Sequence, residues 1–488
     1  MSQKFLFSSI KMPMLKSFDK KKKQTAKYII LDLFASLLAW SLFFIFRRIE
    51  IESTFVQNIQ LFSPIYNFWK LLVGVPVFWF FIFWLSGYYN KAFHKSRVSE
   101  FFQTLTSVFF GSIFLFFILL INDPVVSYKY YYLSFIVLFA IYFIVVYTLR
   151  YTLTRITTHK IHNRTWGFNT LIIGTGNNAK KIYDQIISEK QSSGFMICGF
   201  ISDDKYNTIV NKQMILGGLP DLNRIIKEKS IENIIVAIDN DDKNELFRII
   251  NQLYHFNVEI SFIPQLYDYL VGGIRLSIIY GTPLVNILEN KMPAWQQNTK
   301  RLFDIVISVL GLILTSPLLL YLAIRVKLSS KGKIFFRQER IGLQGVPFQI
   351  IKFRTMYESK NNGKEHRLTE IDDERVTPIG KIMRKYRLDE LPQLCNVLKG
   401  DMSLVGPRPE QKYYVDKIVE IAPYYSLILK VKPGITSWGM VKYGYANTVD
   451  KMIERLNYDI IYMENVSILL DIKIIIYTVK TIFSGEGI

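Results

Sequence analysis

Cysteine is almost missing from this sequence. Cys198 and Cys395 are the only two among 488 residues, and neither has a second cysteine or a histidine at ligand spacing. A disulfide framework and a zinc site are therefore both excluded. We expect both thiols to be buried as small apolar groups, in a protein whose cysteines face a reducing compartment.

Acidic residues are also in short supply. The chain has 40 Asp and Glu against 60 Lys and Arg, which gives a formal net charge of +20. Half of the residues are nevertheless apolar and 15% are aromatic, a composition that excludes intrinsic disorder. A basic surplus suits either a nucleic acid or an anionic lipid surface, and the aromatic excess favours lipid. At about 150 residues per domain, the length predicts about three structural units.

Charges are missing altogether from long stretches of the first 150 residues. Three charge-free intervals are each long enough to cross a hydrocarbon layer of about 30 Å. They lie between residues 70 and 91, between 100 and 123, and between 129 and 150. Residues 28–46 form a fourth stretch, in which Asp32 is the single charge. The sequence therefore predicts four transmembrane helices within residues 1–150, preceded by a basic N-terminal tail.

The short loops between these helices differ in charge. Fifteen Lys and Arg lie in the N-terminal tail, between the second and third helices and just after the fourth, whereas the opposite loops hold four. Basic residues of short loops stay on the cytoplasmic side of a bilayer. We therefore expect both termini to lie in the cytoplasm.

Residues 165–290 have the pattern of a water-soluble α/β domain. Strands predicted at 168–173, 196–201, 233–238 and 258–263 alternate with helices, which indicates a Rossmann-like parallel sheet. The turn at 174–179 approximates a dinucleotide fingerprint, but Ala179 replaces its third glycine. The acidic candidates Asp203 and Asp204 also lie farther on than the usual ribose ligand. Nucleotide binding and a role in packing, dimerisation or regulation are both compatible with this pattern.

A fifth charge-free stretch, residues 305–324, differs from the first four. Both of its flanks are strongly basic, and a crossing would place five positive charges outside. Its midpoint is Ser316-Pro317, where proline lacks the amide donor and the helix should break. The eleven residues before the break rise about 16 Å as a helix, roughly half of the hydrocarbon layer. The sequence predicts a re-entrant hairpin over 302–325, with a kinked spanning helix as the alternative. A backbone carbonyl that loses its partner at the break could accept a hydrogen bond from the Ser316 hydroxyl or from a neighbouring helix.

The last 190 residues contain the chemistry-bearing motifs. Strands are expected at 334–340 and 346–354, and a polar loop at 358–374. Beyond the loop, the adjacent carboxylates Asp389 and Glu390 stand close in sequence to arginines and to the stiff Pro407-Arg408-Pro409. Such a mixture of charges is often a solvated helix face. A carboxylate that attacks a phosphate, however, must overcome the repulsion between two anions, so such a site needs arginines or a divalent metal to neutralise the charge. We expect Mg²⁺ on Asp389 and Glu390, and phosphate binding by Arg337, Lys352, Arg354, Arg375, Arg384 and Arg408.

The combination of motifs resembles a known family. The runs KRLFDIVISVLGLILTSPLL, FFRQERIG, KFRTM, LDELPQLCNVLKGDMSLVGPRPE and KPGIT are similar to those of bacterial polyprenyl-phosphate sugar phosphotransferases, the large monotopic phosphoglycosyl transferases of capsule, exopolysaccharide and O-antigen assembly. The resemblance implies four transmembrane helices, a degenerate, CoA-binding-like Rossmann domain at 165–290 and a monotopic α+β catalytic domain at 298–488. It also implies a protein of the bacterial inner membrane with its catalytic domain on the cytoplasmic face.

The resemblance further implies a reaction. Asp389 would attack the sugar-bearing phosphate of a UDP-sugar and release UMP, and undecaprenyl phosphate would then take the phosphosugar from the enzyme. Glu390 would organise magnesium and phosphate, Arg384 would hold the carboxylate pair in place, and Arg408 would match the family's Pro-Arg-Pro arginine. Ser316-Pro317 matches the family's re-entrant helix break. A homodimer is expected by family analogy, and nucleic acid is not expected as a partner.

One segment departs from the family pattern. After KPGIT the family usually continues with glycine and a Gln-Val pair, whereas this chain has residues 437–441 as SWGMV. This departure affects the prediction of the sugar more than any other prediction. We favour glucose or galactose, with an N-acetylated or deoxyamino sugar as the competitor. A hypothesis of another class is that the protein is a catalytically silent membrane scaffold or ligand sensor. The intact Asp389-Glu390 pair argues against it, together with Arg384 and Arg408, because a silent scaffold would not need that combination.

Overall fold

The computed structural model describes most of the chain in two compact units. One unit comprises residues 1–232 with 278–282, and the other comprises 233–277 with 283–488. Asp203, Asp204 and the loop residues 358–372 lie outside the described part. The described residues are 12–47, 49–50, 64–90, 97–120, 128–202, 209–239, 243–253, 256, 258–263, 284–286, 292–357, 373–444 and 446–484.

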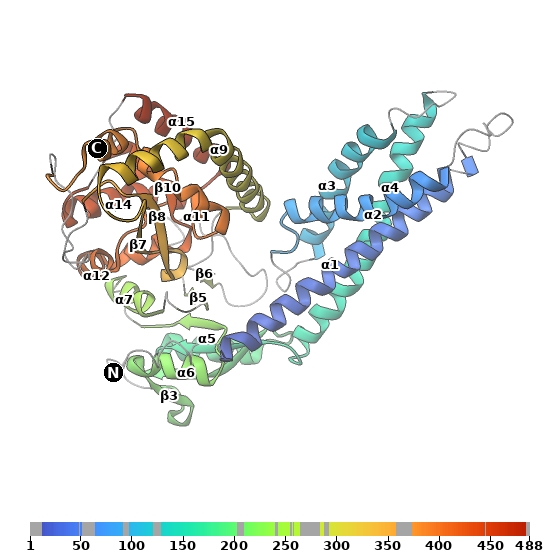
Figure 1. Ribbon diagram of the computed structural model, residues 1–488. Helices are drawn as coiled ribbons and strands as arrows, with labels where there is room; N and C mark the ends of the chain where they lie inside the picture. The colour runs from blue at the N-terminus through green and yellow to red at the C-terminus, as the bar shows by residue number, and fades with distance from the viewer. Residues whose placement is uncertain are drawn as a thin grey trace. The chain divides into compact units, whose positions relative to one another are not determined.

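Long apolar helices dominate the first unit (Figure 1). The four predicted spans correspond to α1 (Met12–Arg47), α2 (Pro64–Leu85), α3 (Arg97–Leu115) with the π-helical turn η2 (Phe116–Leu120), and α4 (Lys129–His162). Among the described residues, four helices are long and apolar enough to cross a membrane, in α1, α3, α4 and the later α9, while α2 contributes the shorter apolar segment Leu71–Leu85. The chain is thus a membrane protein, as the charge-free stretches predict.

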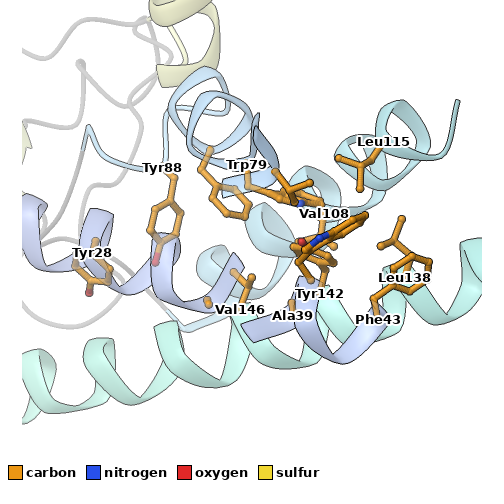
Figure 2. Close-up of a cluster of buried hydrophobic side chains, with 14 of the residues drawn as sticks. Tyr28, Ala39, Phe43, Trp79, Tyr88, Val108, Leu115, Leu138, Tyr142 and Val146 are labelled. Carbon is orange, nitrogen blue, oxygen red and sulfur yellow. The ribbon is translucent and has the colours of Figure 1, made fainter. Parts of the chain in front are cut away.

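Aromatic side chains fill the interior of this helical bundle, as Figure 2 shows. The Trp79 ring of α2 stacks on Tyr142 of α4 with 4.5 Å between the ring centroids, and both side chains are fully buried. Gly111 of α3 lies against the same indole, since a Cβ atom added there would stand 2.5 Å from the ring. A glycine is therefore needed where α3 approaches α2.

A buried ion pair joins α1 to α4. Arg150 Nε and Nη2 donate to the two carboxylate oxygens of Asp32 at 2.7 and 2.8 Å. The third nitrogen donates to Thr104 of α3 at 3.1 Å, and the Tyr89 hydroxyl donates to Asp32 at 2.8 Å. The guanidinium also lies 3.5 Å from the centroid of the Tyr88 ring. The single charge within the first predicted span is therefore matched by a cation from the last one.

Parallel strands follow the helical bundle, as predicted. In the first unit, β1 (Phe168–Ile173) pairs in parallel with β2 (Phe195–Ser202), which pairs in parallel with β3 (Ile215–Gly218). The turn after β1 leads into α5 (Asn177–Ser188), and α6 (Leu222–Glu228) follows β3. The sequence missed β3, because its residues include two glycines and little apolar surface.

The second unit begins with a smaller ladder. Strand β4 (Asn233–Val236) pairs in parallel with β5 (Glu259–Phe262), and β5 pairs antiparallel with the short β6 (Val285–Asn286). Helix α7 (Lys243–Leu253) connects β4 to β5. The two remaining predicted strands, 233–238 and 258–263, are thereby confirmed with slightly shorter bounds.

Helix α9 (Ala294–Ser329) contains the fifth apolar stretch. The predicted interruption of the helix is wrong, because α9 stays helical through Ser316 and Pro317. Proline at 317 cannot donate to the carbonyl of Ile313, four residues earlier, and the Ser316 hydroxyl donates to that same carbonyl at 2.8 Å. The expected role of Ser316 is thus confirmed. In Figure 1, α9 bends into two legs that run in different directions.

The rest of the second unit packs against α9 through α10, α11 and β9. An antiparallel ribbon, a two-stranded parallel pair and short helices follow α9 along the chain. They are β7 (Phe335–Ile341), β8 (Pro347–Phe353), α10 (Pro378–Lys385), η6 (Leu388–Glu390), α11 (Gln393–Lys399), β9 (Ser403–Val405), α12 (Lys412–Ile421), η7 (Pro423–Lys430), β10 (Gly434–Thr436), α13 (Trp438–Lys442), α14 (Val449–Glu464) and α15 (Ile468–Ser484).

The expectation that both cysteines are buried is wrong. Cys395 is exposed and Cys198 is half-buried. Cys395 lies on α11, whose inner side is formed by the buried Gln393, Asn396 and Val397. At about 100° per residue, position 395 then points outward.

The Asp32–Arg150 pair generates a stability prediction. Replacing Arg150 by Met leaves the buried Asp32 carboxylate without its cation, which should cost about 3–5 kcal/mol. The double variant Asp32→Asn with Arg150→Met removes both charges and should recover most of that loss. Thermal unfolding in detergent tests this: equal destabilisation of the single and double variants would contradict a role for the pair.

Candidate active site

The antiparallel ribbon of β7 and β8 supplies the first basic residue of the site. The two strands pair without a register shift, so that Lys352 lies opposite Phe336 and Arg337 lies opposite Ile351. Residues directly opposite in a ladder share a face, and neighbours along a strand alternate. Lys352 and Arg337 therefore point to opposite faces of the ribbon, and only Lys352 joins the carboxylate pair described next.

Asp389 and Glu390 lie on the tight 3₁₀ turn η6, between α10 and α11. Arg387 precedes the turn with φ 53°, a left-handed conformation that few non-glycine residues adopt. The chain reverses there after α10 ends and before Pro392 starts the approach to α11. Both carboxylates are buried as a result, with 9% of Asp389 and 8% of Glu390 exposed.

Glu390 is surrounded by cations from three different elements. Lys352 Nζ of β8 lies 2.7 Å from Glu390 Oε1, and Arg408 Nη2 lies 3.5 Å from the same oxygen. Arg387 Nη1 lies 3.8 Å from Oε2. Burial alone would raise the pKa of Glu390, but these three positive charges outweigh burial and hold the pKa below its ordinary value. Glu390 is therefore ionised at neutral pH.

Asp389 has a different environment from its neighbour. Within the described ranges, no salt bridge ends on its carboxylate. Burial raises the pKa of Asp389, and the adjacent Glu390 raises it further, while Lys352 and Arg384 oppose the shift only in part. Two neighbouring carboxylates with pKa values pushed apart have different chemical roles available to them.

The Pro407-Arg408-Pro409 loop is fixed at both ends. Gly406 packs so closely on the next loop that an added Cβ would stand 2.2 Å from the Lys432 carbonyl oxygen. On the other side, Glu410 is buried between Arg455 Nη2 at 2.6 Å and Arg340 Nη1 at 3.1 Å. These anchors hold the Arg408 guanidinium at Glu390.

The remaining predicted phosphate ligands lie elsewhere or act from a distance. Arg384, in the last turn of α10, donates from Nε to Thr355 Oγ1 at 2.9 Å, and its charge lowers the pKa of Asp389. Arg375 binds Asp373 with two nitrogens and lowers the pKa of that carboxyl to about 2.

Arg354 is not in the carboxylate cluster either. Its guanidinium donates to the carbonyl groups of Ser330 at 2.8 Å and Lys331 at 2.9 Å, just beyond the end of α9. Cations at a helix C-terminus stabilise its exposed carbonyls. Of the predicted phosphate ligands, Lys352 and Arg408 thus contact Glu390, and Arg384 acts on Asp389 through its charge. The other three lie outside the cluster: Arg337, Arg354 and Arg375.

Two residues outside the predicted set of ligands contact the site. Arg387, one of the basic residues close to the carboxylate pair in sequence, pairs with Glu390. Met440, within the segment that departs from the family pattern, places its sulfur 3.0 Å from Arg408 Nη1 and 4.0 Å from Arg387 Nη1. No sequence signal assigns a methionine to a cluster of arginines.

Asp389 and Glu390 are the candidate ligands for a metal ion. The described residues contain no group of three or more His, Cys, Asp or Glu side chains that could hold an ion. Mg²⁺, however, commonly binds through one or two carboxylates together with substrate phosphates. Asp389 and Glu390 fit that mode, with Glu390 already engaged by three cations.

Two known protein families match parts of the chain. Residues 295–485 match the bacterial sugar transferase family, and residues 85–264 match a CoA-binding domain family. The UDP-glucose:undecaprenyl-phosphate glucose-1-phosphate transferase of Klebsiella pneumoniae is 36% identical over 288 residues, which cover 59% of this chain and 62% of that protein. The enzyme of the same name from Caulobacter vibrioides is 42% identical over 190 residues, covering 38% and 71%.

A relative with another sugar in its name is about as similar. The UDP-N-acetylgalactosamine-undecaprenyl-phosphate N-acetylgalactosaminephosphotransferase of Aeromonas hydrophila is 37% identical over 251 residues, covering 51% of this chain and 58% of that protein. The chain spans about 60% of the length of several curated relatives that it matches. The motifs, the two matched regions and these identities lead to one assignment: the chain belongs to the bacterial sugar transferase family.

Proposed function

We propose that this protein transfers a sugar-1-phosphate from a UDP-sugar to undecaprenyl phosphate and releases UMP. The observation that carries the proposal is the pair of buried, adjacent carboxylates with opposite environments. Asp389 has a raised pKa and no salt bridge among the described residues, whereas Glu390 is held ionised by three cations. A nucleophile and its electrostatic support are thereby separated between neighbouring side chains.

The reaction would proceed in two displacements at one phosphorus. An oxygen of the Asp389 carboxylate attacks the sugar-bearing phosphorus, a P–O bond forms, and the P–O bond to the other phosphate breaks with its electron pair leaving on UMP. An oxygen of undecaprenyl phosphate then attacks the same phosphorus and displaces Asp389 as a free carboxylate. A covalent intermediate lets a soluble nucleotide and a membrane lipid use one site in turn.

The charge of the cluster suits these substrates. Lys352, Arg384, Arg387 and Arg408 bring four positive charges against the two carboxylates, so the buried site retains a positive surplus. A diphosphate can neutralise that surplus, and the arginines can offset the charge that develops as UMP leaves. If bound by Asp389 or Glu390 with the diphosphate oxygens, Mg²⁺ would add further neutralisation.

We propose glucose or galactose as the sugar, with an N-acetylated or deoxyamino sugar as the competitor. Relatives of similar identity have names that specify glucose and N-acetylgalactosamine. Family membership therefore leaves both sugar classes open.

The packing of α9 supports the re-entrant hairpin rather than a fifth span. Near its start, Lys300 donates to the Val405 carbonyl of β9 at 2.9 Å and Arg301 to the Val397 carbonyl of α11 at 2.7 Å. At its other end, Arg354, which directly follows β8, donates to the Ser330 carbonyl. The Ile351 amide of β8 in turn donates to the Asn396 side chain of α11. Both ends of α9 are thus fixed to one catalytic body.

The middle of α9 is the part suited to lipid. Leu314 is 78% exposed and Ile313 is 62% exposed, between the two anchored ends of the helix. Lipid covers such apolar surface in a hairpin that enters and leaves by the same face. Together with the basic loops, this packing supports the proposal that the catalytic domain lies on the cytoplasmic face of the bacterial inner membrane.

The nucleophile is tested by Asp389→Asn. Purified wild type, given a UDP-sugar panel and undecaprenyl phosphate, should release UMP, and the Asn variant should lose at least about 10³-fold of that rate because the amide cannot form the intermediate. Asp401→Asn, a change to a partly exposed carboxylate of the same domain, is the matched control and should stay active. Equal UMP release by wild type and Asp389→Asn would remove the nucleophile, and no release from any UDP-sugar would favour a silent scaffold.

The pH profile tests the electrostatics. Since Asp389 must be ionised and its pKa is raised, the acid limb of kcat/KM should lie above the ordinary carboxyl pKa of about 4. Replacing Lys352 by Met removes a positive charge that lowers the pKa of Asp389, so the limb should move to higher pH. Lys399→Met, at a side chain that is 71% exposed, should leave the limb in place. A limb that moves to lower pH in the Lys352 variant would contradict this account.

Cysteine labelling tests the hairpin. In a background with Cys198 and Cys395 changed to Ser, a cysteine at Ser329 should react with an impermeant maleimide only after the cytoplasmic side is opened. Tyr128→Cys, at an exposed residue before α4, should react from the outside and serves as the matched control. Labelling of position 329 from the outside would show a fifth span.

A further inference from the structure

The sulfur of Met440 contacts the same two arginines as Glu390. It is 3.0 Å from Arg408 Nη1 and 4.0 Å from Arg387 Nη1, and Met440 is 8% exposed. The same two guanidinium groups reach Glu390, Arg408 through Nη2 and Arg387 through Nη1. Each arginine therefore contacts both a carboxylate and a thioether.

The segment that bears Met440 is anchored independently of the carboxylate pair. The Ser437 hydroxyl caps α13 and accepts from the Met440 amide at 3.0 Å. Asp459 of α14 accepts from the Gly439 amide at 3.0 Å. A Cβ atom on Gly439 would stand 2.7 Å from Arg455, so α13 lies directly against α14.

Asp459 also lies near the Arg408 loop. Burial raises the pKa of the Asp459 carboxyl to about 6, and Arg455, the Gly439 amide, Ser437 and the backbone of Arg408 oppose that rise. The buried carboxylate that accepts from the Gly439 amide is thus also a neighbour of the Arg408 backbone. The position of the sulfur relative to the guanidinium is set by the fold rather than by a flexible surface contact.

A thioether has an effect on arginine that a carboxylate does not. Its sulfur is a weak acceptor without charge, so it can orient an N–H group and exclude water while the guanidinium keeps its full positive charge. A carboxylate at the same place would cancel part of the surplus that suits a diphosphate. Leucine would fill the same volume without accepting an N–H group.

We propose that Met440 is a positioning residue that orients Arg408 and Arg387 for the diphosphate of the nucleotide substrate. The inference rests on the proposed function, since it assigns these arginines to that diphosphate. It concerns substrate binding rather than the displacement at phosphorus, which is carried out by Asp389.

The test compares Met440→Leu and Met440→Gln in the full-length protein. The loss of one weak hydrogen bond to each arginine predicts a rise of about three- to tenfold in the KM for UDP-glucose in Met440→Leu, with kcat within about twofold of wild type. The Kd for UDP, measured by calorimetry without turnover, should rise by the same factor. Met440→Gln supplies an amide oxygen as acceptor and should restore both constants to within about twofold of wild type.

Met452→Leu is the matched control, because this methionine is buried in the core between α12 and α14. It should leave KM, kcat and the Kd for UDP unchanged. Unchanged binding constants in Met440→Leu, or a loss confined to kcat, would overturn the inference. If the wild type releases no UMP, the proposed function fails, and UDP binding by the Leu and Gln variants still decides whether Met440 orients the arginines.

Discussion

The structure of the catalytic domain depends on the burial of two adjacent carboxylates among cations from separate elements. Asp389 and Glu390 would repel each other strongly if both were ionised and removed from water without partners. Three cations stabilise the ionised form of Glu390: Lys352 from β8, Arg387 just before the turn and Arg408 from the Pro-Arg-Pro loop. Asp389 is left with a raised pKa and without such a partner among the described residues, which is the state that a carboxylate nucleophile needs.

The same constraint links the chemistry to the membrane. The ends of α9 are bound by β9, by α11 and by Arg354, the residue that follows the ribbon strand bearing Lys352. A site that must accept a water-soluble nucleotide and a membrane lipid has to stand at the boundary between the two phases. In the proposed function, an apolar helix with both ends anchored to the same domain would keep the site at that boundary.

Sequence alone predicted the elements better than their contacts. Charge-free stretches located the helices of the first unit, and runs of β-branched residues located β1, β2, β4 and β5 nearly to the residue. The strand β3 was missed because its glycines carry no apolar signal. Proline at 317 predicted a break in the helix, but the helix continues. The Ser316 hydroxyl donates to the Ile313 carbonyl that the proline leaves without its usual donor, and the rule for proline does not include such a neighbour.

The candidate site shows the same limit. The Asp389-Glu390 pair and Arg408 were visible as motifs, and Lys352 followed from its strand. Arg354 looked equivalent to Lys352 two residues earlier, but it caps the end of α9. Met440 could not be found from its residue type. Which cation meets which carboxylate is decided by tertiary packing, and no spacing rule along the chain contains that information.

The central claim, that Asp389 is the nucleophile, is tested most directly by a single turnover without lipid acceptor, followed by mass spectrometry of the intact protein and of its peptides. The account predicts one UMP per enzyme and a phosphosugar adduct on the peptide that contains Asp389, whereas UMP release without an adduct, or an adduct on another residue, would contradict it.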